Sequence, residues 1–357
     1  MKVLYAIQGT GNGHLSRARD IIPVIEEYAQ LDILVSGTQA EVELGYPVKY
    51  RKKGLGFVFG KNGGIDILST YRDADISSLM KEINTLPVEN YDLVINDFEP
   101  VSAWACRRKK VPCISLSHQA SLLSKIVPRP KKKDPVATFL LENYAPTDFQ
   151  LSFHFASYDE NIFTPVIRKQ VRNTESEDKG HYTVYLPAFD DKKLIKRLSA
   201  FSDTRWEIFS KHTRSTYQKE NITIRPVSNE AFLKSMAEST GVLCGAGFET
   251  PAEALFLGKK LMVVPMKGQY EQQCNAAALR QMGVPVIKNL KEKNLPKIGE
   301  WLTNGKPIPV FYPDQTRTIV KQIFEEYIWM LKDNEPENNL LIREYCRTNT
   351  PKYEIAD

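Results

Sequence analysis

The sequence lacks the features that mark several classes of protein. Its five cysteines form no Cys-x-x-Cys pair, which argues against a disulfide framework or a structural zinc site and for a reducing compartment. No apolar run is long enough for a transmembrane helix, and the run at residues 3–7 is too short for a signal peptide. No basic stripe carries interleaved aromatic residues, so nucleic-acid binding gains no support. We therefore expect a cytoplasmic protein.

The net charge is only +5, and one segment concentrates part of it. Arg129 and the three lysines at residues 131–133 lie between apolar residues of the segments 122–127 and 139–141. A mixture of this kind can hold a protein against an anionic membrane face. The two interpretations are therefore a peripheral contact with the inner membrane face and an ordinary charged surface loop.

Residues 240–283 predict two consecutive strand–turn–helix units. An apolar strand stops at Gly245-Ala246-Gly247, and a helix follows over about residues 249–257. A second strand is expected at residues 261–264 and a second helix at residues 270–281. Such units place two helix N-termini at one edge of a parallel sheet, where open α/β sheets bind ligands and where phosphate is favoured.

Polar residues occupy the positions that a nucleotide site at this edge needs. Gly245 and Gly247 let backbone amides approach an anion, and Thr250 offers a hydroxyl group. Glu253 can accept hydrogen bonds from a ribose diol. The residues that open the next helix could bind a second polyhydroxylated group: Glu271, Gln272 and Asn275. The alternative is a plain pair of βαβ units with ordinary caps.

The chain begins with a strand at residues 2–8 that runs into Gly9-Thr10-Gly11-Asn12-Gly13-His14, and a helix follows over about residues 15–30. This is a Rossmann-like opening, but His14 replaces the third glycine of the dinucleotide motif. The next strand, residues 31–35, also ends without a carboxylate, and both facts count against NAD. A histidine after a glycine loop at a helix start can instead act as a general base.

Two further strands of the first half end in polar residues. The strand at residues 91–98 carries Asp97, which could orient His14 or cap the helix that starts near residue 100. The strand at residues 111–116 is followed by Ser117, His118 and Gln119. The glycine-rich and aromatic residues 52–71 predict either a loop that contacts an acceptor or a hairpin without function.

The alternation of strands and helices stops and restarts, which predicts two domains. We expect a first domain at residues 1–165, with residues 147–155 as its last strand, and a linker at residues 166–180. The second domain is expected at residues 181–330, ending in an amphipathic helix. A tail at residues 331–357 could cross back to the first domain.

Three motifs in the second half resemble the donor signature of two-Rossmann (GT-B) glycosyltransferases. They are Gly-x-Gly-Phe-x-Thr-x-x-Glu at residues 245–253, Gly-Lys-Lys-x-x-x-x-Pro at 258–265 and Glu-Gln-x-x-Asn-Ala at 271–276. This family includes the UDP-glycosyltransferases and the bacterial GlcNAc transferase that forms lipid II. The resemblance implies two Rossmann-like α/β domains facing across a cleft, with the acceptor in the first and the donor in the second.

The resemblance also implies roles for the donor-side residues. The position of Glu253 binds the ribose, the loop around Gly245 faces the diphosphate, the pair Glu271-Gln272 binds the sugar, and the turn at Val227 packs on the base. The implied donor-binding set is Gly245, Ala246, Gly247, Phe248, Thr250, Glu253, Glu271, Gln272, Asn275 and Val227. Relatives usually carry His or Arg where this chain has Gly245, so the diphosphate charge must be met by backbone amides or by another basic residue.

The first half resembles the acceptor domain of the same family. The loop that ends in His14 matches a loop whose histidine is the base in plant-type enzymes, and Asp97 matches the aspartate that pairs with it. The segment at His118 resembles a His-Glu-Gln-Asn segment of the lipid II enzyme. The resemblance thus implies catalytic roles for His14, Asp97 or His118, and an acceptor or phosphate loop formed by Gly11, Asn12, Gly13 and Gln119.

The expected activity is transfer of a hexosyl or N-acetylhexosaminyl group from a nucleotide-sugar, with UDP favoured by the resemblance. The acceptor would be a hydroxyl of a glycolipid, a cell-envelope polysaccharide precursor or a small molecule. No Asp-x-Asp pair lies in residues 181–330 to hold a divalent ion on the diphosphate, so we expect inversion without metal or other cofactor. The alternatives are an epimerase or hydrolase on the same fold and a non-catalytic protein that binds nucleotide-sugars.

Overall fold

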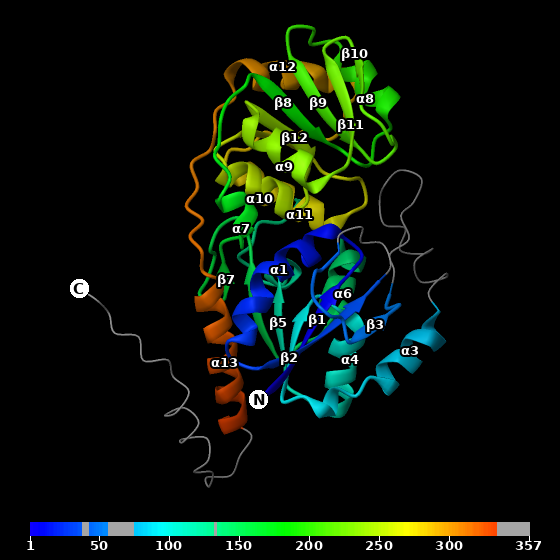
Figure 1. Cartoon of the computed structure of the whole chain (residues 1–357), viewed down its shortest axis with the longest axis vertical. Helices are drawn as coiled ribbons and strands as arrows, with labels where there is room; N and C mark the ends of the chain where they lie inside the picture. Colours follow the sequence, from blue (N-terminus) through cyan, green and yellow to red (C-terminus); the bar gives the residue numbers. More distant parts are fainter. Residues whose placement is uncertain (38–42, 56–74, 132–133, 334–357) are drawn as a thin grey trace, which may run out of the picture.

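The computed structural model describes residues 1–37, 43–55, 75–131 and 134–333 of the chain. Their strands form two sheets, which Figure 1 shows one above the other with helices around each. The glycine-rich segment at residues 52–71, predicted as a loop that contacts the acceptor or as a hairpin, falls largely outside the described residues. The predicted tail beyond residue 333 also lies outside them.

The first sheet is parallel throughout, with the strand order β3-β2-β1-β4-β5-β6-β7. Its strands are β1 (Lys2–Gln8), β2 (Gln30–Ser36), β3 (Tyr50–Lys52), β4 (Leu93–Asp97), β5 (Cys113–Ser117), β6 (Phe149–Phe153) and β7 (Ile162–Phe163). The helices that follow or cover them are α1 (Asn12–Glu26), α3 (Ile76–Thr85), α4 (Pro100–Lys109), α5 (His118–Ser121) and α6 (Pro135–Tyr144).

The second sheet has the order β10-β11-β9-β8-β12-β13 and is parallel except for the pair β10-β11. Its strands are β8 (His181–Tyr185), β9 (Arg205–Ser210), β10 (Tyr217–Lys219), β11 (Ile222–Pro226), β12 (Gly241–Gly245) and β13 (Lys260–Val264). The remaining helices are α7 (Lys169–Arg172), α8 (Asp191–Leu198), α9 (Asn229–Glu238), α10 (Glu249–Phe256), α11 (Tyr270–Gln281), α12 (Leu295–Asn304) and α13 (Thr316–Asp333).

Burial explains why polar and apolar residues do not alternate along the central strands. Residues 3–7 of β1 are fully buried, because helices cover both faces of the sheet and every side chain meets apolar neighbours. Residues 242–244 of β12 are buried in the same way. The Rossmann-like α/β architecture expected from the sequence is therefore present in both halves.

One strand prediction was wrong. Residues 147–155 were expected to contain the last strand of the first sheet, and β6 does lie there, but β7 (Ile162–Phe163) adds a further parallel strand beside it. The pairing joins Ser152 to Ile162 and Phe153 to Phe163. Two residues are too few to show any hydrophobic period, so this strand could not be recognised from the sequence.

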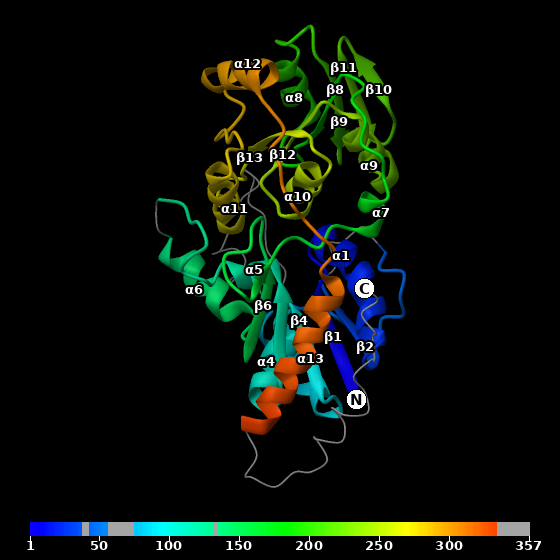
Figure 2. The same ribbon diagram turned by 90° about the vertical axis from the view of Figure 1, so that its left-hand side faces the viewer.

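Helix α13 packs on the first sheet, although the predicted boundary of 181–330 assigned it to the second domain. Figure 2 shows this helix beside the first sheet, reached by an extended segment after α12. Phe324 of α13 stacks on Tyr28 with 5.0 Å between the ring centroids, and Tyr312 in the extended segment donates to the Phe155 carbonyl at 2.9 Å. The chain therefore returns to its first half before residue 331.

Candidate active site

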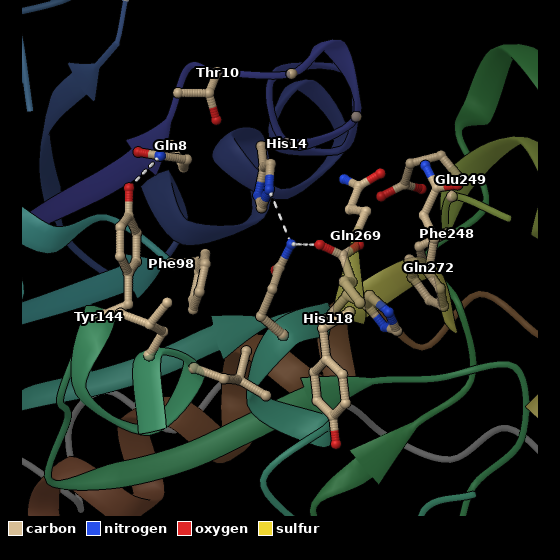
Figure 3. A pocket seen from close by; sticks show the side chains of 18 of the residues that line it. Gln8, Thr10, His14, Phe98, His118, Tyr144, Phe248, Glu249, Gln269 and Gln272 are labelled. Carbon is tan, nitrogen blue, oxygen red and sulfur yellow. Dashed lines mark hydrogen bonds between the residues drawn. The ribbon is translucent and has the colours of Figure 1, made fainter. Parts of the chain in front are cut away.

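A cavity of about 340 Å³ lies between the carboxyl edge of the first sheet and the first turns of α10 and α11. Figure 3 shows side chains from both halves converging on it, among them His14, His118, Glu249 and Gln272. Because the strands that lead into these loops are parallel within each sheet, their carboxyl ends meet at one edge, and the polar loop residues gather there.

His14 and Asp97 form a hydrogen-bonded pair at this cavity. Strands β1 and β4 are neighbours with Ile7 opposite Asp97, so the loop after β1 meets the end of β4. His14 Nδ1 lies 2.8 Å from Asp97 Oδ1. In the tautomer that donates Nδ1–H to Asp97, Nε2 is an acceptor that lines the cavity, with the amide nitrogen of Gln119 at 3.3 Å.

Asp97 is held in its ionised form by two partners. Burial alone would raise the pKa of this fully buried carboxyl, but the charges of Arg17 and His14 and their hydrogen bonds lower the pKa below its ordinary value. The cap of α4 is supplied instead by Glu99, whose carboxylate accepts from the amides of Val101 and Ser102 at 2.8 and 2.6 Å. The alternative that Asp97 merely caps this helix is therefore wrong.

The turn after Asp97 carries a left-handed backbone conformation. Phe98 has φ of 56°, a value that costs a non-glycine residue energy and that clusters at functional sites. The turn aims the Phe98 ring at Tyr144 of α6, with ring centroids 4.6 Å apart. Gln8 holds the Tyr144 hydroxyl at 2.7 Å from the other side. The backbone strain thus coincides with one wall of the cavity.

His118 is bound to the protein through both ring nitrogens. Nδ1 lies 2.9 Å from the Phe153 carbonyl and Nε2 lies 2.8 Å from Asn275 Oδ1. The ring stacks on Phe248 with centroids 3.9 Å apart, and burial lowers the pKa of the imidazole although both hydrogen bonds oppose this. With no nitrogen facing a substrate, His118 joins the two halves, and this geometry favours His14 as the base.

Six of the ten predicted donor-side residues line one or both of two cavities. Gly247, Phe248, Glu271 and Gln272 line the large one, and Glu271 accepts a hydrogen bond from Gln119 at 3.2 Å. A smaller cavity of about 100 Å³ is lined by four predicted donor-side residues, Gly245, Gly247, Thr250 and Gln272. The end of β8 and the turn after it, residues 185–189, also line this cavity. Ala246 and Asn275 are buried behind these walls.

Sequence reasoning missed the turn at residues 185–189. β8 and β12 are parallel neighbours in the second sheet, although β9, β10 and β11 lie between them in the sequence. Their carboxyl ends therefore lie side by side, and the turn after β8 meets the loop after β12. Val227 directly follows β11, farther along the same sheet, and does not contribute to the lining of the smaller cavity.

Glu253 is occupied by a residue of the linker. Both of its carboxylate oxygens accept from Arg168, at 2.5 Å from Nε and 2.8 Å from Nη2, and a third nitrogen of Arg168 donates to Asn229 at 2.7 Å. The Glu253 side chain is only 3% exposed. Nothing in the local sequence marks Arg168 as its partner, because the two residues are 85 positions apart.

Three helices whose first turns line the large cavity begin without a side-chain cap. They are α1, α10 and α11, which start after Gly11, Phe248 and Gln269. Helices α4, α6, α8 and α9 are all capped by a side chain. The uncapped amides are oriented to bind anionic or polyhydroxylated groups in the cavity.

The other wall of the large cavity is apolar. It is formed mainly by α6 and two loop residues: Leu55, Phe98, Ala137, Leu140, Leu141 and Tyr144. The outward side of the same region exposes Ile126, Val136 and Phe139 by 57%, 56% and 61%. This wall can contact an apolar group of a ligand in the cavity.

The chain does contain one Asp-x-Asp pair, at residues 73 and 75, outside the donor half. Asp75 caps α3 by accepting from the Ser78 amide at 2.9 Å, and residue 73 lies outside the described residues. Within the described ranges, no three His, Cys, Asp or Glu side chains are grouped to hold a metal ion. In the same ranges, no helix has the length and apolar character needed to cross a membrane.

The model of the family described as glycosyl transferase family 1 matches residues 1–305 of the chain. No curated protein matches this chain. A structure of MurG from Acinetobacter baumannii, 16% identical, has a TM-score of 0.57 and covers 91% of this chain and 99% of its own. Arabidopsis thaliana UGT89C1 complexed with UDP is 14% identical, with a TM-score of 0.57 and coverage of 97% and 99%. The spinosyn forosaminyltransferase SpnP is 12% identical, with a TM-score of 0.55 and coverage of 93% and 98%. These structures confirm the GT-B fold.

Proposed function

Because this chain belongs to glycosyl transferase family 1, we propose that it transfers a sugar from a UDP-linked donor to an acceptor hydroxyl in the large cavity. The observation that carries this proposal is the His14–Asp97 pair, 2.8 Å between Nδ1 and Oδ1, at a cavity that the first turns of α10 and α11 also line. Such a pair is what an inverting transfer needs on its acceptor side.

The proposed reaction is a single displacement. His14 Nε2 removes the proton from the acceptor hydroxyl as its oxygen attacks the anomeric carbon. The bond from that carbon to the nucleotide diphosphate breaks, the diphosphate leaves with the electron pair, and the configuration inverts. Asp97 holds the Nδ1–H and stabilises the imidazolium that forms, as a carboxylate partner does in other histidine bases.

The donor side is supported by the helix N-termini. The uncapped amides of α10, with Gly247 open to solvent space, can bind the negative charge that grows on the leaving diphosphate. Burial of the donor between the halves would exclude water that otherwise hydrolyses it. We propose that this electrostatic support replaces a divalent ion, so that transfer is independent of metal. UDP is favoured because the UGT89C1 structure of the same fold is described as complexed with it.

For the acceptor, the apolar wall of the cavity favours a glycolipid or a small molecule with an apolar group over a wholly polar polysaccharide precursor. The exposed apolar side chains of Ile126, Val136 and Phe139 lie near exposed Arg129 and Lys131. This combination supports a peripheral contact with the anionic cytoplasmic face of a membrane, and the four described cysteines, all free and buried, fit a reducing cytoplasm.

The proposal is tested first by thermal shifts with UDP, GDP, CMP, TDP and their sugar conjugates, with and without Mg²⁺. A ligand at a hundredfold over its Kd stabilises the native state by roughly 2.7 kcal/mol. We expect a shift with the UDP group alone, independent of Mg²⁺. No shift with any nucleotide would contradict a donor site.

Turnover of the sugar conjugate that binds then separates the enzyme classes. His14→Ala and Asp97→Asn should each lower kcat by about 10²- to 10⁴-fold while donor affinity stays within a few-fold. His212→Ala, at an exposed histidine of the second half, is the matched control. Product from the donor alone would indicate a hydrolase or epimerase, and binding without any turnover would indicate a nucleotide-sugar sensor.

A further inference from the structure

Arg17 is a cation buried between the two halves of the molecule. Its side chain is only 2% exposed and lies on α1, one turn after His14. Nη2 donates to both oxygens of Asp97, at 2.9 and 2.8 Å, and Nη1 donates to Glu249 Oε1. A single guanidinium therefore contacts the carboxylate that holds the proposed base and a carboxylate in the first turn of the proposed donor helix.

The two halves are in close contact at this point. A Cβ on Gly13 would lie 2.9 Å from Glu249 Cγ, so any larger residue at this position would require the Glu249 side chain to move. Burial raises the pKa of Glu249 to about 7, although Arg17 opposes the rise, and Glu253 one turn later adds to it. Glu249 thus stays close to Arg17 in a poorly hydrated place where a charge is costly without its partner.

Arg17 also limits how Asp97 can turn. Asp97 Oδ1 accepts from both His14 Nδ1 and Arg17 Nη2, while Oδ2 accepts from Arg17 alone. A planar guanidinium can serve two carboxylates at fixed angles, whereas the ammonium of lysine acts as a single point charge. The orientation of the His14 ring is therefore set by a carboxylate that Arg17 fixes.

We propose that Arg17 is a positioning residue that couples the His14–Asp97 pair to α10, so that the base keeps its orientation through the contact of Arg17 with Glu249. The role assigned to the base rests on the proposed function, whereas the geometric coupling does not. A purely structural ion pair would affect stability alone; this one also sets the geometry of the histidine.

The coupling is tested without substrate by proton NMR of the free protein. The Nδ1 proton of His14, hydrogen-bonded to Asp97, gives a downfield resonance that is assigned by its loss in His14→Gln. We expect Arg17→Lys and Glu249→Gln each to shift or broaden this resonance. The double variant should change the resonance no more than the single variants do, because each single change already breaks the Asp97–Arg17–Glu249 bridge. Arg19→Gln, at an exposed arginine of the same helix, is the control and should leave it in place.

Glu249→Gln tests the coupling even if the change at Arg17 prevents folding. The Glu249 side chain is 19% exposed and glutamine has the same shape, so we expect this variant to fold. An unchanged His14 resonance in a folded Glu249→Gln protein would overturn the proposal. So would effects of the two single variants that simply add.

Turnover supplies an independent readout once a donor is found. We expect Glu249→Gln to lower kcat by about tenfold to a hundredfold, since a misplaced base loses rate, while the Kd of UDP changes less than threefold. A raised Kd with unchanged kcat would assign Glu249 to donor binding and contradict the coupling. If His14→Ala keeps full turnover, the proposed base is wrong, and the resonance experiment still judges the coupling.

Discussion

At the scale of single residues, Arg168 of the predicted linker contacts Glu253, the residue that the resemblance assigns to the ribose. Each carboxylate oxygen of Glu253 accepts one hydrogen bond from Arg168, and the planar guanidinium fixes the plane of the carboxylate. Each oxygen retains a second lone pair that can accept a hydroxyl group. The linker arginine is therefore compatible with ribose binding by Glu253 and would orient the carboxylate for it.

This arrangement predicts the result of replacing Arg168. Arg168→Gln should weaken binding of UDP by about tenfold to a hundredfold, the equivalent of a hydrogen bond to a charged group. It should also remove the preference for UDP over 2′-deoxy-UDP, because a loosely held Glu253 no longer selects the ribose diol. Calorimetric titration of both nucleotides measures the two effects.

The control for this experiment is Lys169→Gln, at the next residue of the linker, whose side chain is exposed. It should bind both nucleotides as the parent protein does. If Arg168→Gln keeps the full preference for UDP, Arg168 does not orient a ribose-binding carboxylate.

At the scale of elements, α6 forms a wall with two different sides. It is capped by Asp134, which accepts from the Ala137 amide at 3.0 Å, and none of its residues is fully buried. Leu140 and Leu141 face the cavity, and Phe139 faces outward. One side can therefore bind the acceptor while the other contacts a surface.

Substitutions on the two sides of α6 should separate these roles. Leu141→Ala removes apolar contact worth about 1–3 kcal/mol and should raise the KM of a soluble acceptor about tenfold or more, with the Kd of UDP unchanged. Phe139→Ser should leave that KM unchanged and reduce cosedimentation with phosphatidylserine vesicles. A rise in acceptor KM with Phe139→Ser, or none with Leu141→Ala, would contradict the assignment of sides.

The elements also show what a sequence can predict here. The strand at residues 2–8 and the helix at residues 270–281 were predicted with the bounds that the structure has. An apolar run that stops at a glycine loop marks the strand, and the helix is marked by the loop before it and by Gly283 after it. The resemblance to plant-type enzymes paired His14 with Asp97, and the neighbouring parallel strands β1 and β4 bring the two residues to one edge of the sheet. The ion pairs of Arg17, Arg168 and Glu249 could not be predicted, because ion pairs between distant segments leave no local pattern.

At the scale of the whole molecule, Glu249 links stability to pH. Its pKa in the folded protein, about 7, exceeds the ordinary value of about 4.3, so the folded state binds more protons than the unfolded state between these limits. Stability from this residue is therefore greatest below about pH 4.3 and is lost as the pH rises toward 7. Asp97 has the opposite sign: its lowered pKa contributes stability that is lost only when the pH falls below about 4.

Replacing Glu249 should remove this dependence. We expect the stability of Glu249→Gln relative to the parent protein to increase by roughly 3 kcal/mol between pH 4.5 and pH 8, since each unit of pKa shift corresponds to about 1.4 kcal/mol. Urea unfolding followed by circular dichroism at several pH values measures the difference. Asp97 contributes little to this change, because its lowered pKa places its titration below this pH range. A constant difference across this range would show that Glu249 titrates normally.

The return of α13 to the first sheet also determines the order in which the molecule can be completed during synthesis. Ile319, Val320 and Ile323 of this helix belong to the same buried cluster as Ile21, Ile22 and Ile25 of α1. A ribosome that adds 5–20 residues per second needs roughly 15–60 s to go from one helix to the other. Throughout that interval the apolar side of α1 lacks its cover. The half that is translated first is therefore the half that is finished last, and the nascent chain must keep this surface from other proteins until its final helix emerges.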